Sequence, residues 1–357
     1  MVCTQCLYTF QDQEYMYIKG DLIIPAIFDI HYRGTGPFNC GNIRTRNGFL
    51  NSEAFAYTLE YINSGNSPIK LNNVQIGGVG FDGCMNPFRS NAIVSAFHSQ
   101  WFKEDDGSAK FDLEKSVGWM LYDSETTIDV SESLGNFNIP VMTPAATSHI
   151  LDDKTMFKTF FRTIPSDGKV TKAMAQLAKE LNFEYIITLN APDKESRDAT
   201  EQFRKYAEAQ GICIASSYEF VTGGSMDTLI EYIADSSTRI VAVFTYPDQY
   251  IEDLLMAKSR KSEAANIIFM ANHPWSTPLI KHDALRFADR SLMFGSSAYT
   301  TPITSFRNYL AGKQAFPHNP WYNEFYQAYY ECSLGTSWQY QSNCYPIRSL
   351  IDSKYFI

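Results

Sequence analysis

Apolar runs typical of β-strands alternate with amphipathic helical stretches along almost the whole chain. In the clearest helical stretch, residues 166–182, Val170, Met174 and Leu177 recur at helical spacing and Ser166 stands at the expected N-cap. Strands are expected at residues 21–28, 74–81, 117–122, 185–189, 212–216, 239–244, 267–270 and 292–294, and further helices at 48–62, 195–210, 225–234 and 249–260. Repeated strand–helix–strand units predict an α/β protein with parallel sheets, each covered by helices on both faces.

Two successive series of these units predict a bilobal α/β protein. We place the crossover between the series near residues 162–167 and a return near 299–304. The expected domains are therefore a first lobe at 1–162, a second lobe at 163–300, and an incomplete return to the first lobe at 301–357.

Residues 139–167 carry the most information about a binding site. An apolar run ends at Thr143 in the small and hydroxyl-bearing sequence Pro-Ala-Ala-Thr-Ser, and a second β-like run at 160–164 leads into Pro-Ser-Asp and a helix. Open α/β sheets bind ligands beyond the carboxyl ends of their strands. The segment therefore predicts a cleft for a small polar ligand, and it contains no nucleophile paired with a base.

The composition limits the function further. A net charge of −9 argues against nucleic acid or an anionic membrane surface as the main partner. No window approaches the roughly 18 apolar residues of a membrane span, and the first residues show no secretory signal, so the chain is either intracellular or a piece of a longer protein. Nucleotide-binding, hydrolase and zinc-protease motifs are absent, and the six histidines show no metal spacing, so no enzyme, cofactor or metal is expected.

Several blocks of the sequence together resemble one family. They are the opening GDLIIPAIFDIH, the sequence CGNIR before a helix ending in EYIN, the segment 139–167, the pair LNFEY and GICIA, and the final NPWYNEF followed by CSL. In order and spacing they are similar to the extracellular ligand-binding domain of the metabotropic glutamate receptors, which are class C G-protein-coupled receptors. The resemblance spans roughly residues 19–352 and implies a Venus-flytrap fold of the type I periplasmic-binding-protein kind.

The resemblance also implies how the cysteines pair. Cys40 is expected to bond Cys84, and Cys332 is expected to bond Cys344. Cys213 matches a cysteine that pairs, in the family, with a cysteine-rich module downstream. Cys3 and Cys6 are left unassigned, and their Cys-x-x-Cys spacing is also compatible with a metal or redox pair. Seven reduced cysteines in a cytosolic protein are the alternative interpretation.

In the family, an amino-acid ligand is held by hydroxyls, backbone amides and one acid. Ser124 and Thr147 match the hydroxyl-bearing contacts, the backbone amide of Ala145 matches a carboxylate contact, and Asp167 matches the acid facing the ammonium. Convergent N–H and O–H donors suit a carboxylate, and a carboxylate suits an ammonium group. The alternative is that these residues are structural: Ser124 as a helix N-cap, Asp167 as a first-turn acid, and Thr147 as a turn residue.

Other positions depart from the family. Asn51, with Asn47 just before the same helix, stands where the family has a basic residue that grips the side-chain carboxylate of glutamate. Glu195 replaces a tyrosine of the second lobe, and Asn272 or His273 replaces an aspartate. Losing the basic residue removes a charge-assisted contact of roughly 1.5–3 kcal/mol. A neutral amino acid, an amine or no ligand at all is expected in place of glutamate.

The resemblance thus implies a ligand-binding domain on the extracellular face of the plasma membrane, as part of a longer receptor. An amino-acid-like molecule would bind between the lobes and favour their closure, with Ser124, Ala145 and Thr147 on the first lobe and Asp167 or Glu195 on the second. It further implies a homodimer formed through the first lobe, and a G protein that is contacted only through a membrane domain missing from this chain. A soluble or decoy solute-binding protein of the same fold is the alternative.

Overall fold

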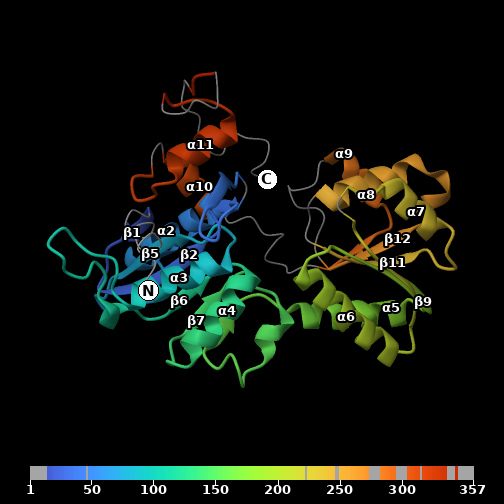
Figure 1. Cartoon of the computed structure of the whole chain (residues 1–357), viewed down its shortest axis with the longest axis horizontal. Helices are drawn as coiled ribbons and strands as arrows, with labels where there is room; N and C mark the ends of the chain where they lie inside the picture. Colours follow the sequence, from blue (N-terminus) through green and yellow to red (C-terminus); the bar gives the residue numbers. More distant parts are fainter. Residues whose placement is uncertain are drawn as a thin grey trace. The chain divides into compact units, whose positions relative to one another are not determined.

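The structure is a computed structural model that describes residues 14–45, 47–221, 223–245, 249–272, 282–294, 304–313, 316–335 and 342–344. Contacts within the chain divide it into two compact units (Figure 1). As far as each range is described, unit 1 comprises Met1–Ala146, Asp153–Ile164 and Ile303–Ser353, and unit 2 comprises Thr147–Asp152, Pro165–Pro302 and Lys354–Ile357. Unit 1 is therefore assembled from segments far apart in the sequence, whereas unit 2 comes mainly from one.

Unit 1 is built on a six-stranded sheet with the order β1-β5-β2-β6-β7-β8. Its strands are β1 (Tyr15–Ile18), β2 (Leu22–Phe28), β5 (Ile76–Asp82), β6 (Trp119–Leu121), β7 (Val141–Thr143) and β8 (Phe160–Arg162). All neighbouring strands are parallel except β1, which pairs antiparallel with β5 at the edge of the sheet. A separate hairpin is formed by β3 (His31–Arg33) and β4 (Cys40–Ile43).

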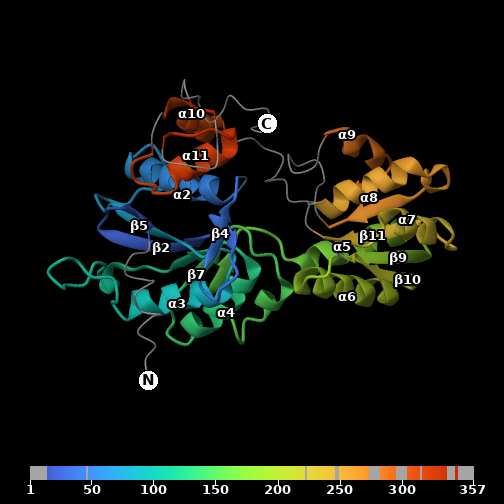
Figure 2. The ribbon, with the colours of Figure 1, turned by 45° about the horizontal axis from the view of Figure 1, so that its top comes forward.

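Helices cover both faces of this sheet. They are α2 (Gly48–Asn63), α3 (Pro87–His98), α4 (Ser124–Gly135), α10 (Thr304–Gly312) and α11 (Tyr322–Tyr330). In Figure 2, α2 lies on one side of the sheet beneath α10 and α11, and α3 and α4 lie on the other side. Local sequence starts these helices: α3 begins at Pro87, whose missing N–H suits the first turn, and the Asn86 side chain accepts a hydrogen bond from the Phe88 N–H.

Unit 2 is built on a parallel five-stranded sheet with the order β10-β9-β11-β12-β13. Its strands are β9 (Tyr185–Asn190), β10 (Cys213–Glu219), β11 (Ile240–Phe244), β12 (Ile268–Ala271) and β13 (Leu292–Met293), and its helices are α5 (Asp167–Glu180), α6 (Lys194–Ala209), α7 (Met226–Ala234), α8 (Gln249–Arg260) and α9 (His282–Leu285). Because side chains alternate along a strand, Ile186 packs with the core under α5 and α6, and Ile187 packs with the core under α7 and α8.

Short 3-10 turns cover Leu113–Lys115, His149–Asp152, Ser262–Ala264 and Arg286–Ala288. The predicted α/β class, with parallel sheets covered by helices, is confirmed. The antiparallel edge strand β1, the β3–β4 hairpin and α3 are not among the elements expected from the sequence. No helix within the described ranges combines the length and the apolar character needed to cross a membrane.

Disulfides join Cys40 to Cys84 and Cys332 to Cys344, the two pairs that the resemblance implies. Both lie in unit 1. Cys213 is an exposed free thiol on β10, and Cys3 and Cys6 lie outside the described residues.

Candidate functional site

Acidic residues stand where three neighbouring strands of unit 1 end. Asp29 follows β2, Asp82 is the last residue of β5, and Asp123 comes two residues after β6. Parallel strands bring their carboxyl ends to one edge of the sheet, which is the edge where α/β proteins bind ligands. Asp29 and Asp82 are almost completely buried. The sequence analysis does not single out these residues, although acids directly after apolar runs were a visible signal for them.

Asp29 has a buried carboxyl group with the Arg44 guanidinium beside it. Its Oδ1 accepts the Met85 N–H at 3.1 Å, and the Arg44 guanidinium lies 3.7 Å from its Oδ2. Arg44 also donates to the backbone carbonyl of Asp29 at 3.2 Å. Burial and the nearby charge of Asp123 raise the pKa of Asp29 to about 8, against the opposing effects of Arg44 and the Met85 N–H. Asp29 therefore links the end of β2 to Met85 and Arg44.

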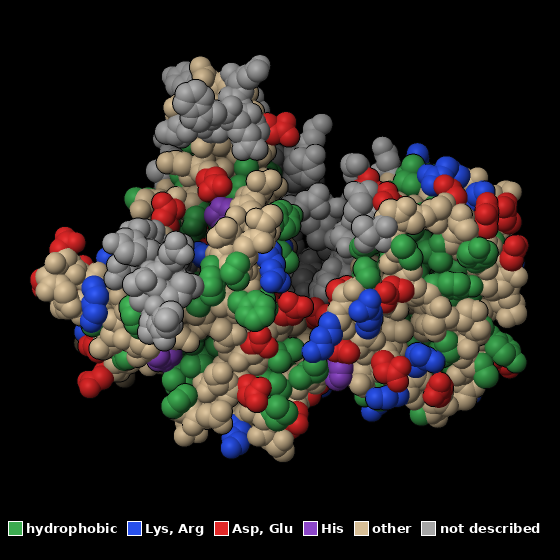
Figure 3. Space-filling model, in the orientation of Figure 1, with side chains coloured by type: hydrophobic (Ala, Val, Ile, Leu, Met, Phe, Trp, Pro, Cys, Tyr) green, Lys and Arg blue, Asp and Glu red, His purple; other side chains and the backbone are tan. Residues whose placement is uncertain are grey.

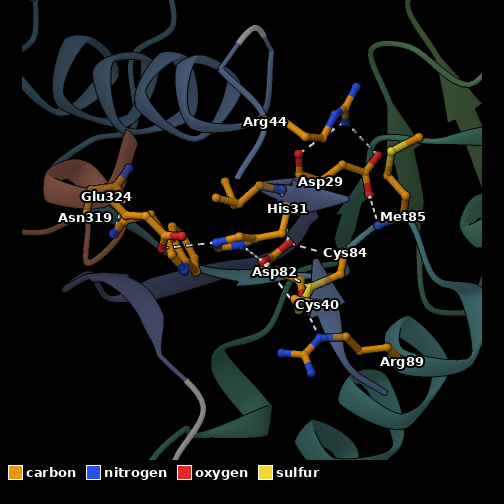
Figure 4. A network of polar contacts seen from close by, with 12 residues as sticks. Asp29, His31, Cys40, Arg44, Asp82, Cys84, Met85, Arg89, Asn319 and Glu324 are labelled. Atoms are coloured by element: carbon orange, nitrogen blue, oxygen red, sulfur yellow. Dashed lines mark hydrogen bonds and ion pairs between the residues drawn. A yellow bond between two sulfur atoms is a disulfide. The ribbon is translucent and has the colours of Figure 1, made fainter. Parts of the chain in front are cut away.

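Asp82 fastens the β3–β4 hairpin, as Figure 4 shows. Its Oδ1 accepts the N–H groups of Ile30 at 3.0 Å and Cys84 at 2.9 Å. Its Oδ2 accepts from His31 Nδ1 at 2.5 Å, and the other ring nitrogen of His31 lies 3.2 Å from Glu324 Oε2 on α11. Burial alone would lower the pKa of His31, but the hydrogen bonds and charges of both carboxylates raise it to about 9.

Ser124 and Ala145 lie at the same strand-end edge of unit 1. Asp123, not Ser124, is the N-cap of α4, since its side chain accepts the Thr126 N–H at 2.8 Å. Ser124 is the first helical residue and is buried. The Ala145 N–H donates to Thr143 Oγ1 at 3.2 Å, so a ligand carboxylate at this amide would compete with Thr143. The N-cap alternative for Ser124 is therefore wrong.

Thr147, Asp167 and Glu195 come together in unit 2. Thr147 Oγ1 donates to Glu195 Oε1 at 3.1 Å, and the Asp167 N–H donates to the Thr147 carbonyl at 2.8 Å. Thr147 and Asp167 are buried, and Glu195 is half-buried. Ser166 caps α5 by accepting the Lys169 N–H, as expected from the sequence. The sequence analysis places Thr147 on the first lobe, but its contacts group it with unit 2.

The positions that depart from the family are distributed over both units. Asn47 is exposed at the N-cap position of α2 and makes no side-chain capping hydrogen bond there. Asn51 is half-buried in the first turn of α2. Asn272 is buried after β12, and its Oδ1 accepts the Thr245 N–H at 3.3 Å. His273, the other alternative for that position, lies outside the described residues.

Comparison with known proteins agrees with this fold. Residues 50–347 match the family described as the receptor family ligand binding region. The chain belongs to that family. It is also similar to the probable metabotropic glutamate receptor mgl-1 of Caenorhabditis elegans, with 27% identity over 352 residues that cover 89% of this chain and 35% of that receptor. The chain thus spans about a third of its curated relative, and the resemblance to metabotropic glutamate receptors is confirmed.

Proposed function

We propose that the ligand of this receptor-type binding region is a small molecule with an ammonium group and without an acidic side chain. The observation that carries this proposal is that Thr147 contacts two acidic residues, one through its side chain and one through its backbone. Glu195 accepts a hydrogen bond from the Thr147 hydroxyl, and the Asp167 backbone donates to the Thr147 carbonyl. Two acidic residues that contact one loop residue make this part of unit 2 acidic, and an ammonium ion is the natural partner of a carboxylate.

Both acids also have a structural role. Each lies in the first turn of a helix, Asp167 in α5 and Glu195 in α6, where a negative charge interacts favourably with the helix dipole. This structural role is compatible with ligand binding, because a carboxylate at the start of a helix can still accept hydrogen bonds from an ammonium group.

Glutamate fits these residues poorly. In the family, a basic residue stands at the position that Asn51 occupies in this chain. The uncharged amide of Asn51 provides no charge-assisted contact for a second ligand carboxylate. Such a contact contributes roughly 1.5–3 kcal/mol. Glu195, where the family has a tyrosine, adds a negative charge. We infer that a neutral amino acid or an amine binds better than an acidic amino acid.

The mechanism we propose is a population shift between open and closed lobes. Only contacts that exist in the closed state can bias that equilibrium, so the groups that matter for signalling are those that the second lobe adds. The role of receptor, not enzyme, the homodimer through the first lobe, the position outside the cell and the coupling to a G protein through a membrane domain remain proposals for the whole protein. The family and the relative named above support the role of receptor.

Thermal-shift measurements on the folded chain test the ligand class. The panel contains the 20 amino acids and common amines. A ligand at about 100 times its Kd should stabilise the chain by roughly 2.7 kcal/mol. Thr147→Ala and Glu195→Gln should each weaken binding by at least tenfold. Glu201→Gln is the matched control, because it removes the same charge from the exposed face of α6 and should leave binding unchanged.

A further variant, Asn51→Arg, tests whether the missing basic residue at this position determines the ligand preference. Asn51→Arg should shift preference toward acidic amino acids and weaken amine binding. Tight glutamate binding by the unaltered chain, or amine binding that Glu195→Gln leaves intact, would contradict the proposal.

A further inference from the structure

Two sulfurs, one imidazole and one carboxylate of unit 1 lie close enough together to bind a single metal ion. Ligand atoms of His31, Cys40, Asp82 and Cys84 all lie within 4.8 Å of one another. Asp82 Oδ2 is central: it lies 2.5 Å from His31 Nδ1, 3.1 Å from Cys84 Sγ and 3.9 Å from Cys40 Sγ (Figure 4). The four residues come from β3, β4, the end of β5 and the turn after it.

The types of the donor atoms indicate which metal ion would bind. Two thiolates, one imidazole and one carboxylate form the four-coordinate set that Zn²⁺ favours. Zinc–sulfur bonds of about 2.3 Å at a tetrahedral angle separate two sulfurs by roughly 3.8 Å. Cys40 and Cys84 are bonded to each other here, so the metal could bind only when this bond is open. Disulfide and metal therefore exclude each other.

The neighbouring groups already orient the four ligands. Asp82 Oδ1 is engaged by the N–H groups of Ile30 and Cys84, which leaves Oδ2 directed at His31 and the two sulfurs. His31 Nε2 lies 3.2 Å from Glu324 Oε2, so Nδ1 is the nitrogen that faces the cluster. A carboxylate on the far nitrogen of a histidine is the usual outer support of a zinc ligand.

We propose that, before the Cys40–Cys84 bond forms, these four residues bind one Zn²⁺ ion. The ion and the disulfide are then alternative cross-links between the β3–β4 hairpin and the end of β5. On binding, the two thiols and His31 Nδ1 release their protons to solvent, and no electrons are transferred. A disulfide-bearing oxidant that later closes the bond takes two electrons from the thiolates of Cys40 and Cys84 and two protons from solvent, becomes two thiols, and releases Zn²⁺ to solvent.

The second disulfide provides an internal control. Cys332 and Cys344 also lie in unit 1, and both are buried. Within the described ranges, however, no group of histidine, cysteine and acidic ligands surrounds this pair. If any reduced pair of cysteines were sufficient, both would take up metal equally.

The first experiment measures metal binding by the full chain after reduction with a trialkylphosphine. Cys3→Ser and Cys6→Ser are introduced throughout, because that pair could bind metal by itself. We expect one Zn²⁺ per chain by competition with a chromophoric chelator, and tetrahedral, two-thiolate absorption with Co²⁺. Cys332→Ser with Cys344→Ser should keep this site, Cys40→Ser with Cys84→Ser should lose it, and His31→Ala should weaken it at least tenfold.

A second readout reports on each thiol separately. Mass spectrometry follows alkylation of each thiol with and without Zn²⁺. Zn²⁺ should slow alkylation of Cys40 and Cys84 at least tenfold and leave Cys332 and Cys344 unaffected. Equal protection of both pairs, no protection, or a Co²⁺ spectrum without thiolate absorption would overturn the proposal.

Discussion

The two units of the chain are stabilised in different ways. Unit 1 has an aromatic core, in which the ring centroids of Phe97 and Trp119 are 5.2 Å apart and those of Phe81 and Phe102 are 5.1 Å apart. It also contains both disulfides. Unit 2 has a core on either side of its sheet: Ile, Leu and Val side chains predominate under α7 and α8, and Ala is the commonest residue under α5 and α6. Within the described ranges, no disulfide lies in unit 2.

The two units also differ in whether their charged side chains are buried or exposed. In unit 1, Glu53 is fully buried on α2 and accepts hydrogen bonds from Asn319 at 2.8 Å and His318 at 3.1 Å. In unit 2, the pair of Arg197 with Glu219 is largely exposed, and acidic and basic side chains are interspersed on the face shown in Figure 3. Exposed pairs contribute little to stability, whereas an unsatisfied buried group is costly.

Chain connectivity explains the contrast. Unit 1 must join its first segment to its last, and specific contacts such as that of Asn319 with Glu53, 266 residues apart in sequence, offset the chain entropy that this costs. Unit 2 is a continuous run of strand–helix units, and burial of apolar surface alone can hold it together. We therefore expect the stability of unit 1 to fall when a single disulfide or buried hydrogen bond is lost. The stability of unit 2 should fall when buried apolar side chains are shortened.

Loss of the Cys40–Cys84 bond should have the largest effect. This bond spans 44 residues of sequence, and the bond between Cys332 and Cys344 spans 12. Loop-closure entropy then predicts a loss of about 4 kcal/mol for Cys40→Ser with Cys84→Ser, and about 3 kcal/mol for the second pair. Native-state hydrogen exchange with mass spectrometry should show the loss in unit 1 peptides only. An equal loss in unit 2 would remove the distinction between the units.

An apolar truncation should have its effect in the other unit. Leu189 is completely buried on β9, and Leu189→Ala should lower the free energy of unfolding by about 3 kcal/mol. Leu181, which is largely exposed after α5, is the control, and Leu181→Ala should change stability by less than about 0.5 kcal/mol. The loss should appear in hydrogen exchange of unit 2. If unit 1 peptides changed equally, the two cores would not be independent.

Replacement of Glu53 tests how much the buried hydrogen bonds of unit 1 contribute to its stability. Glu53→Gln keeps the shape but presents an N–H₂ group to donors, so we expect a loss of about 2 kcal/mol in chemical denaturation. Glu60→Gln is the matched control on the same helix, because Glu60 pairs with Lys313 at the surface at 3.1 Å. A small change in both variants would mean that the buried network contributes little.

Local patterns made most of the fold predictable. Expected strands such as 21–28 and 239–244 agree closely with β2 and β11, because buried parallel strands are short apolar runs between turns. The helix start at Ser166 was readable because N-caps are local chemistry. The hairpin β3–β4 was missed because its strands are short and mostly exposed, and so carry little apolar pattern.

The site was predictable only in part. Family resemblance pointed to Thr147, Asp167 and Glu195, which the structure brings together, but no local pattern predicts the hydrogen bond between Thr147 and Glu195. The same limit applies to Asp82 with His31 and to Glu53 with Asn319. Such contacts join residues distant in sequence, and only the packed fold decides them.

One such distant contact leads to the smallest of our expected effects, a pH dependence confined to unit 1. His98 Nε2 accepts a hydrogen bond from Trp119 Nε1 at 3.0 Å, and burial lowers the pKa of His98 below its usual value of 6.5. The folded state therefore favours neutral His98. Its contribution is fully present above about pH 6.5 and is lost as the pH falls through the lowered pKa.

Loss of this hydrogen bond costs about 1 kcal/mol. Relative to His98→Gln, the free energy of unfolding of unit 1 in the unaltered chain should fall by this amount between pH 7 and pH 5, because other groups such as Asp29 and His31 titrate in both chains. Hydrogen exchange measures it, after correction for the intrinsic exchange rate. His98→Gln should remove this part of the pH dependence, because an amide oxygen still accepts from the indole but does not titrate. An unchanged pH profile in this variant would show that other groups dominate. An equal fall in unit 2 would show that acid acts on the whole chain, not through this contact between α3 and β6.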